Sequence, residues 1–190
     1  MNVLVVHGAG GSAADYADFV AAVQARGWTA SGLDLLGHGE YEAEPFGDPV
    51  GWVSSHADPS ACLWGASLGA YSVLHAAALS PHCAVVAIAP TTEATIRERM
   101  DTWGVRIHPH FREWLDSRDI AQAVPRIRCP VLYVHARDDE RIPLAVSEQL
   151  HELTPRSELV VLESGGHSGP AHDPAVHELT LGWLERVVLA

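Results

Sequence analysis

The stretch GASLG, residues 65–69, lies between a short apolar run at 61–64 and an alanine-rich run at 68–80 that has the composition of a helix. This context predicts a strand, a sharp turn and a helix. In a Gly-x-Ser-x-Gly turn of this kind, the serine is held on a strained and exposed corner above the end of a sheet. Glycines suit the flanking positions because neighbouring backbone packs where a Cβ would clash. The pattern makes Ser67 a candidate nucleophile.

Two later segments carry the groups that a nucleophilic serine needs, and each follows a strand-like run. The stretch ARDDERIP, residues 136–143, contains Asp138 and Asp139, and the stretch SGGHSG, residues 164–169, contains His167. A serine is a weak nucleophile unless an imidazole accepts its proton and a carboxylate orients that imidazole. The chain order of serine, acid and histidine is the order in which hydrolytic enzymes with this serine turn carry them.

The N-terminal stretch VLVVHGAGGS, residues 3–12, predicts a buried strand that runs into a glycine-rich loop. Such a loop can direct a backbone N–H group at an oxyanion that develops during a reaction. Residues 8–13 also match the G-x-G-x-x-A loop of dinucleotide-binding folds, with Asp34 near the position of a ribose-binding acid. That interpretation leaves the segments around Ser67 and His167 without a role, so we favour the first.

In their order along the chain, these segments resemble the α/β-hydrolase superfamily, and the resemblance covers nearly the whole chain. It includes the His-Gly-x loop, the turn DLLGHG at 34–39, the serine turn, the acid loop and the Gly-Gly-His turn. The resemblance implies that Ser67 is the nucleophile and His167 the general base. It also implies an oxyanion hole made by the backbone N–H groups of Ala9 and Leu68.

The resemblance places the third member of the triad at Asp139. The family pattern is G-x-x-D-x-x-V-P, and the residues behind Asp139 are Ile142-Pro143. The glycine of the pattern is Ala136 here, and this departure leaves Asp138 open as the acid. Glu93 is a further alternative, because some relatives carry the carboxylate after the preceding strand. Asp34 is expected to brace the turn that follows it.

Length and composition predict one domain, 1–190, with its own core, because 47% of the residues are hydrophobic and 19% are charged. Family members usually run longer, and we expect the usual first strands to be missing. We also expect a minimal lid, formed by a short lid-like insertion at residues 91–125.

The net charge of −12 predicts that neither nucleic acid nor an anionic membrane surface is a partner. The chain has no lysine, which excludes Schiff-base chemistry. We expect Cys62, Cys83 and Cys129 to be small hydrophobes without a disulfide framework, which suits a reducing compartment. Met1 leads straight into a strand, and no apolar run reaches the roughly 20 residues that span a bilayer. The expected location is therefore the cytoplasm.

Strand-like and helix-like segments alternate, which predicts an α/β fold with a mostly parallel sheet of about six strands and helices on both faces. The expected strands are residues 2–7, 28–33, 60–64, 84–89, 131–135 and 158–162. The expected helices include residues 13–26, capped by Ser12, the serine-turn helix 68–79, on which Tyr71 and His75 are packing or surface residues, and a last helix beginning near Asp173-Pro174. The apolar face of that last helix is expected at Val176, Leu179, Trp183, Leu184 and Val187.

The function that the sequence favours is hydrolysis of small acyl esters through Ser67, His167 and Asp139 and an acyl-enzyme intermediate. The expected partner is a small ester-like molecule, and no cofactor is needed. His108 and His110 could share a metal ion, but no third ligand lies near them in the sequence, so we expect no metal. Two alternatives stay open: a ligand-binding or regulatory protein on the same fold, and a thioesterase, amidase, acyltransferase or C–C hydrolase. The sequence indicates neither the natural substrate nor the oligomeric state.

Overall fold

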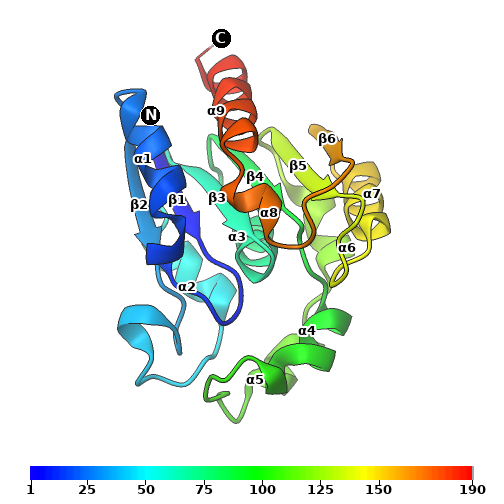
Figure 1. Ribbon diagram of the computed structural model, residues 1–190. Helices are drawn as coiled ribbons and strands as arrows, with labels where there is room; N and C mark the ends of the chain where they lie inside the picture. Colours follow the sequence, from blue (N-terminus) through cyan, green and yellow to red (C-terminus); the bar gives the residue numbers. More distant parts are fainter. Residues whose placement is uncertain (190) are drawn as a thin grey trace.

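Six strands form one entirely parallel sheet in the computed structural model, which describes residues 1–189 (Figure 1). The strands lie in the order β2-β1-β3-β4-β5-β6. Their bounds are β1 Asn2–Val6, β2 Thr29–Leu33, β3 Cys62–Ala66, β4 Ala84–Ile88, β5 Val131–Ala136 and β6 Ser157–Leu162. All six expected strands are confirmed, with ends that differ by at most two residues.

The strand order reverses direction between β1 and β3. From β1 the chain crosses to β2 on one side, and β3 to β6 then follow on the other side. In open parallel sheets, ligands bind outside the carboxyl ends of the strands at such a reversal. The glycine-rich loop after β1 and the serine turn after β3 both lie there.

Helices cover both faces of the sheet, and the strands alternate between two apolar layers. Within β1, Val3 and Val5 pack on one side, whereas Leu4 and Val6 pack on the other. The first layer is covered by α1 (Ala17–Ala25), α8 (Gly169–His172) and α9 (Pro174–Val188), and the second by α2 (Pro49–His56), α3 (Leu68–Leu79), α6 (Ile120–Ala123) and α7 (Leu144–Leu153). The remaining helical segments are η1 (Ala13–Tyr16), η2 (Gly39–Tyr41), α4 (Glu93–Arg99), η3 (Met100–Thr102), α5 (Phe111–Asp116) and η4 (Val124–Arg126).

Helix ends follow the expected signals. Ser12 precedes the first helical turn, and Gly27, with φ of 73°, follows α1. The carboxylate of Asp173 accepts a hydrogen bond from the Ala175 N–H group at 2.8 Å and caps α9. One expectation for α9 is wrong: Leu179 is 37% exposed.

The buried face of α9 explains why Leu179 lies outside it. Its buried members include Val176, Thr180, Trp183 and Leu184, which recur at intervals of three and four residues. Leu179 lies one residue before Thr180, so it points about 100° away from the centre of that face.

Within residues 91–125, the segments α4, η3 and α5 form a group of short helices beyond the carboxyl edge of the sheet, where α4 and α5 lie in Figure 1, whereas α6 packs on the face of the sheet. Phe46 ties this group to the rest of the molecule, because its N–H group donates to the Arg106 carbonyl and its carbonyl accepts from the His108 N–H group, both at 2.7 Å. The Phe46 ring is fully buried against Trp103 and Phe111. The segment is therefore anchored by a central aromatic contact.

The three cysteines are free thiols, and Cys62 and Cys129 are buried. Burial raises the pKa of Cys62 to about 12 and that of Cys129 to about 11. These two side chains thus pack as small hydrophobes. Within residues 1–189, no helix combines the length and the apolar character that crossing a membrane requires.

Candidate active site

Ser67 sits on a strained turn between β3 and α3. Its backbone has φ of 54° and ψ of −113°, which is unusual for a residue with a side chain. Its N–H group donates to the Ile88 carbonyl at 2.9 Å, which fixes the turn against β4. A Cβ on Gly69 would collide with the carbonyl oxygens of Val6 and His7, and a Cβ on Gly65 would collide with the Gly69 backbone. Only glycine at these two positions lets the turn pack this closely.

The structure brings Ser67, His167 and Asp139 into one hydrogen-bonded row. His167 Nε2 lies 3.0 Å from Ser67 Oγ, and His167 Nδ1 lies 2.8 Å from Asp139 Oδ2. Because a carboxylate only accepts hydrogen bonds, Nδ1 carries the proton and the Nε2 lone pair faces the serine hydroxyl. This tautomer can take the serine proton.

Asp139 is held as a carboxylate by the chain around it. Its side chain is fully buried, and Oδ1 accepts hydrogen bonds from the N–H groups of Arg141 and Ile142 at 2.8 and 2.9 Å. Burial acts to raise the pKa of Asp139, but the hydrogen bonds from His135, His167 and these two N–H groups outweigh it and hold that pKa well below its usual range. Asp139 therefore stays ionised at neutral pH.

His135 is a contact of Asp139 that sequence analysis missed. It is fully buried at the end of β5, with Nε2 3.3 Å from Asp139 Oδ2 and 3.0 Å from the Ile142 carbonyl oxygen. Both neighbours are acceptors, so Nε2 carries a proton. Nδ1 lies 2.7 Å from the Ser147 hydroxyl. His135 thus joins the acid loop to α7. Its position directly before the acid loop was visible in the sequence, but its contact with the carboxylate was not.

The two alternative acids have other partners. Asp138 Oδ1 accepts a hydrogen bond from the Gly166 N–H group at 2.8 Å, so it holds the loop that carries His167 rather than the imidazole itself. Glu93 Oε1 lies 2.9 Å from the Tyr71 hydroxyl and 3.3 Å from His75 Nε2. It therefore binds two side chains of α3 that we had expected only to pack or face solvent.

The loop after β1 passes directly over Ser67. A Cβ on Gly8 would lie 3.4 Å from the Ser67 Cβ. The N–H groups on either side of Ala9 are engaged: that of Gly8 donates to the Tyr16 hydroxyl at 3.4 Å, and that of Gly10 donates to His38 Nε2 at 3.1 Å. The N–H group of Ala9 has no acceptor within the described part of the chain.

Leu68 begins α3, so its N–H group is one of those at the helix start that lack a partner in the helix. Ala9 and Leu68 both line the same cleft as Ser67. Two unpaired N–H groups on one cleft, one at a helix N-terminus, favour negative charge between them.

Two neutral histidines hold this loop in place. His7 Nε2 accepts from the Leu35 N–H group at 3.0 Å, while Nδ1 donates to the Gly8 carbonyl at 2.7 Å. His38 Nε2 accepts from Gly10, and Nδ1 donates to the Leu36 carbonyl at 3.1 Å. Burial lowers the pKa of both imidazoles. Each histidine must accept through Nε2, which only the neutral form can do.

Asp34 braces the neighbouring turn, as expected. Its Oδ2 accepts from the Glu40 N–H group at 2.9 Å, and its Oδ1 accepts from the Ala13 N–H group at 2.5 Å. Both carboxylate oxygens are thus engaged with the backbone. Nothing in this arrangement favours ribose binding over a structural role.

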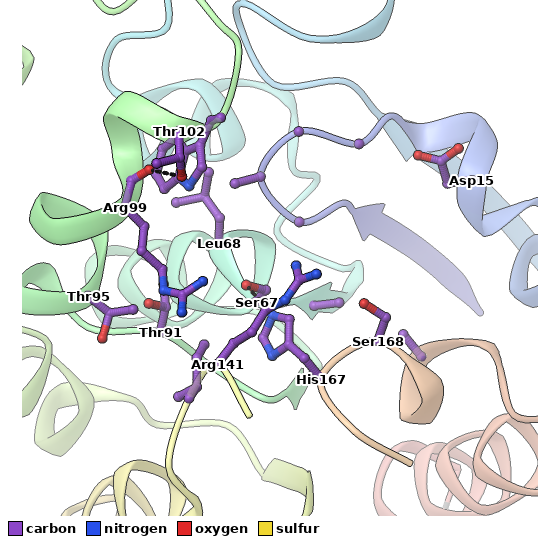
Figure 2. Close-up of a pocket in the computed structure, with 18 of the residues that line it drawn as sticks. Asp15, Ser67, Leu68, Thr91, Thr95, Arg99, Thr102, Arg141, His167 and Ser168 are labelled. Carbon is purple, nitrogen blue, oxygen red and sulfur yellow. Dashed lines mark hydrogen bonds between the residues drawn. The ribbon is translucent and has the colours of Figure 1, made fainter. Parts of the chain in front are cut away.

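A cleft of about 560 Å³ opens above Ser67 and His167. It is lined by glycines and alanines, by hydroxyl groups and by a few larger side chains. Its lining residues are Gly8, Ala9, Gly10, Gly11, Asp15, Tyr16, Ala66, Ser67, Leu68, Thr91, Thr95, Arg99, Thr102, Trp103, Arg141, Ile142, His167, Ser168, Ala171 and His172. Figure 2 shows Ser67 and His167 at the centre of this set. Across residues 1–189, no group of three or more histidine, cysteine or acidic side chains is arranged to hold a metal ion.

Comparison with solved structures settles the fold. Est1E from Butyrivibrio proteoclasticus, solved with ferulic acid bound, superposes with a TM-score of 0.81 at 19% sequence identity. The superposition includes 100% of this chain and 90% of the Est1E chain. The esterase domain of a Rhodothermus marinus protein gives a TM-score of 0.74 at 23% identity, over 98% of this chain and 87% of its own. This chain has the α/β-hydrolase fold.

Sequence comparison reaches only part of the chain. A protein of Pseudomonas savastanoi pv. phaseolicola named "Putative carbamate hydrolase RutD" is 37% identical over 67 residues, which is 35% of this chain and 26% of that protein. The match thus spans about a quarter of the relative's length. No protein-family model matches the sequence. The shared fold is established over the whole chain, whereas the chemistry has to be argued from the site of this α/β-hydrolase-fold protein itself.

Proposed function

We propose that this protein is a serine hydrolase that cleaves small carboxylic esters. One observation carries the proposal: the hydrogen-bonded row from Ser67 through His167 to Asp139, with distances of 3.0 and 2.8 Å. The names of its structural neighbours, which include an esterase domain and a lipase-esterase related protein, and of the carbamate hydrolase relatives support hydrolysis of a carbonyl compound.

The first half of the reaction would form an acyl-enzyme. Ser67 Oγ attacks the ester carbonyl while His167 Nε2 takes the hydroxyl proton, and Asp139 stabilises the resulting imidazolium. The N–H groups of Ala9 and Leu68 face the negative oxygen of the tetrahedral intermediate. When the intermediate collapses, the carbon–oxygen bond to the alcohol breaks and His167 gives its proton to the departing alkoxide.

The second half would release the acid by the same steps. His167 Nε2 removes a proton from water, which attacks the acyl carbonyl. The intermediate collapses with return of the proton to Ser67 Oγ. Over the whole cycle, one ester and one water give one alcohol and one acid, and the proton returns to Ser67, so the reaction needs no cofactor. Residues 91–125 would contribute Arg99, Thr102 and Trp103 to the cleft and act as a small fixed lid.

A fluorophosphonate tests the nucleophile. We expect Ser67 Oγ to displace fluoride and form one phosphonyl adduct on the peptide that contains residues 65–69, because such reagents need an activated serine beside an oxyanion hole. The wild type should also hydrolyse 4-nitrophenyl acetate, and Ser67→Ala should lose both reactions. Ser55→Ala changes an exposed serine on α2 and serves as the matched control. An unmodified Ser67 peptide in the folded wild type, as found by mass spectrometry, would refute the proposal.

A ligand-binding protein with little turnover is the second candidate function, because the same fold and cleft could serve binding alone. Pre-steady-state kinetics separates the two. A burst of 4-nitrophenol followed by continuous turnover identifies an enzyme. A burst of one equivalent followed by no turnover identifies a protein that is acylated but does not release the acyl group.

A further inference from the structure

Two guanidinium groups line the cleft that contains Ser67. Arg99 is the last residue of α4, and Arg141 belongs to the loop between β5 and α7. In Figure 2 both side chains extend from their backbones toward the labelled Ser67, and each ends near it in that view. Segments separated by about 40 residues in the sequence therefore place two positive charges on one small cleft.

These charges are poorly neutralised by the protein. No carboxylate lies within ion-pair distance of Arg99 in residues 1–189, and the one partner of Arg141 is Glu140, whose Oε1 is 3.5 Å from Nε. Both members of that pair are more than half exposed, so their attraction is weak. By contrast, Arg26 is paired with two glutamates on α9, at 2.7 and 3.0 Å. Within the described residues, Arg99 thus has no ion-pair partner and Arg141 has only a weak one, although the chain has 24 acidic and 12 basic residues.

Among its described lining residues, the cleft offers no acidic side chain beside the two arginines, and Glu140 is not one of those lining residues. Asp15 is the sole acidic residue among the described lining residues, and its Oδ2 accepts a hydrogen bond from the Ser12 N–H group at 2.7 Å. Figure 2 places Asp15 on the side of the cleft away from Arg99. Thr91 and Thr95 lie on the same side as Arg99 and add hydroxyl groups there. One end of the cleft is thus polar and positively charged.

We propose that the substrate of this site carries an ionised carboxylate, which Arg99 and Arg141 bind while Ser67 attacks the ester carbonyl. The inference rests on the proposed esterase function and narrows it to small anionic esters. A guanidinium binds a carboxylate through two parallel N–H bonds, and the charge makes these bonds stronger than neutral ones. The overall negative charge of the protein would repel such a substrate, so the two arginines must supply the local attraction.

Matched ester pairs test the charge. Mono-4-nitrophenyl adipate carries the carboxylate on the acyl side, and 4-acetoxybenzoate carries it on the alcohol side. The methyl ester of each is nearly the same size and is neutral. We expect kcat/KM to favour the acid over its methyl ester by about tenfold or more in at least one pair, as one good charge-assisted contact implies. Rates of spontaneous hydrolysis are subtracted.

Variants assign this preference to the two side chains. In Arg99→Gln/Arg141→Gln the preference should fall to about one or below, while kcat/KM for the neutral esters changes less than about threefold. Arg128→Gln is the control, because Arg128 is exposed and precedes the amino end of β5, on the edge of the sheet opposite the cleft. Equal losses for acid and methyl ester in the double variant would assign the arginines to the reacting oxygen and overturn the proposal. A wild-type preference for the methyl ester in both pairs would also overturn it.

Binding to an inactive variant separates this inference from the proposed function. If the wild type cleaves none of the four esters, the esterase function fails, and calorimetry on Ser67→Ala then decides the inference. Tighter binding of the acids than of their methyl esters, lost in Ser67→Ala/Arg99→Gln/Arg141→Gln, supports a carboxylate site. Equal binding of acid and methyl ester refutes it.

Discussion

The acid loop assigns different tasks to two adjacent aspartates. Asp139 points at His167 and receives two backbone N–H groups on its other oxygen, whereas Asp138 points at the Gly166 N–H group. Both residues thus support His167, one through its ring and the other through its loop. Residue type cannot distinguish their roles, because both are aspartates and they are adjacent in the sequence.

Asp139→Asn should lower kcat far more than Asp138→Asn. Loss of the orienting carboxylate costs on the order of 10⁴ in kcat in a serine protease triad, because the imidazole is then held in the wrong tautomer. In Asp138→Asn the amide oxygen can still accept from Gly166, so we expect a loss of about tenfold or less. Steady-state kinetics with 4-nitrophenyl acetate measures both. Equal and small losses would contradict the assignment.

Glu93→Gln provides the control for the third candidate acid. Glu93 contacts Tyr71 and His75 on α3, and no contact joins it to His167. The hydrogen bonds from His75 and Tyr71 outweigh burial and lower the pKa of Glu93. Its loss should therefore reduce stability rather than turnover, by about 1 to 3 kcal/mol for a mostly buried network. A loss of kcat as large as that of Asp139→Asn would move the acid to Glu93.

Sequence analysis found the residues whose neighbours along the chain form a pattern. The serine turn, the acid loop and the Gly-Gly-His turn were visible for that reason, and the structure brings their side chains together. His135 and Arg141 lie within four residues of Asp139, but no pattern assigns a contact to either side chain. Arg99 belongs to a separate segment, and its place at the cleft depends on how α4 and the acid loop meet in space.

At the scale of elements, the loop after β1 is held in place by two histidines that must stay neutral, His7 at its start and His38 in the turn after β2. His7 and His38 each accept a backbone hydrogen bond through Nε2 and donate one through Nδ1. Protonation would add a proton to Nε2, so that both ring nitrogens are donors. The hydrogen bonds from the N–H groups of Leu35 and Gly10 would then be lost. The conformation of residues 7–11 should therefore depend on pH, independently of the titration of the proposed triad.

The free energy of unfolding should fall as the pH drops from 7.5 to 5.5. A histidine in the unfolded chain takes up a proton near pH 6.5, whereas His7 and His38 in the fold resist protonation because burial lowers their pKa. The unfolded state then binds more protons, so stability is fully present above pH 6.5 and is lost below it. Asp139 acts in a separate window below its ordinary pKa of about 4. Urea unfolding at the two pH values measures the change.

His38→Gln should weaken this pH dependence. A glutamine can accept from Gly10 and donate to Leu36 without titrating, so the difference between pH 7.5 and 5.5 should shrink. His110→Gln removes an exposed histidine and should leave the difference as in the wild type. The same pH dependence in all three proteins would show that His38 does not contribute to it.

Element types and order were predictable because the strands are short, apolar and separated by helices with recognisable ends. Ser12, Gly27 and Asp173 all mark helix ends as expected. The side of a helix that is buried was less predictable. Leu179 was assigned to the core of α9 by its chemistry, but Thr180 occupies the buried position because the angular spacing of the helix overrides side-chain type.

At the scale of the whole molecule, the sheet reversal and the group of short helices at 91–125 together define the volume of the cleft. The reversal between β1 and β3 places the glycine-rich loop beside Ser67. Phe111 and Trp114 stack on each other and do not line the cleft, so that of Trp103, Phe111 and Trp114 only Trp103 lines it within the described residues. Phe111 and Trp114 therefore stabilise the position of this segment and do not deepen the site.

This cleft should favour short acyl chains. Each methylene gains about 0.8 kcal/mol only when it is buried against apolar surface. The large aliphatic side chains in the lining, Leu68 and Ile142, are themselves 1% and 2% exposed, so they offer little surface to a long chain. Among neutral 4-nitrophenyl esters, kcat/KM should peak at acetate to butyrate and then level off or fall. The series is measured from two to twelve carbons at concentrations well below KM.

Trp103→Ala removes the one indole that lines the cleft within the described residues, so it should lower the ratio of kcat/KM for butyrate to that for acetate. A steady rise in kcat/KM to twelve carbons would mean that a chain finds apolar surface outside this cleft, and it would point to a lipid-like substrate in place of a small polar one.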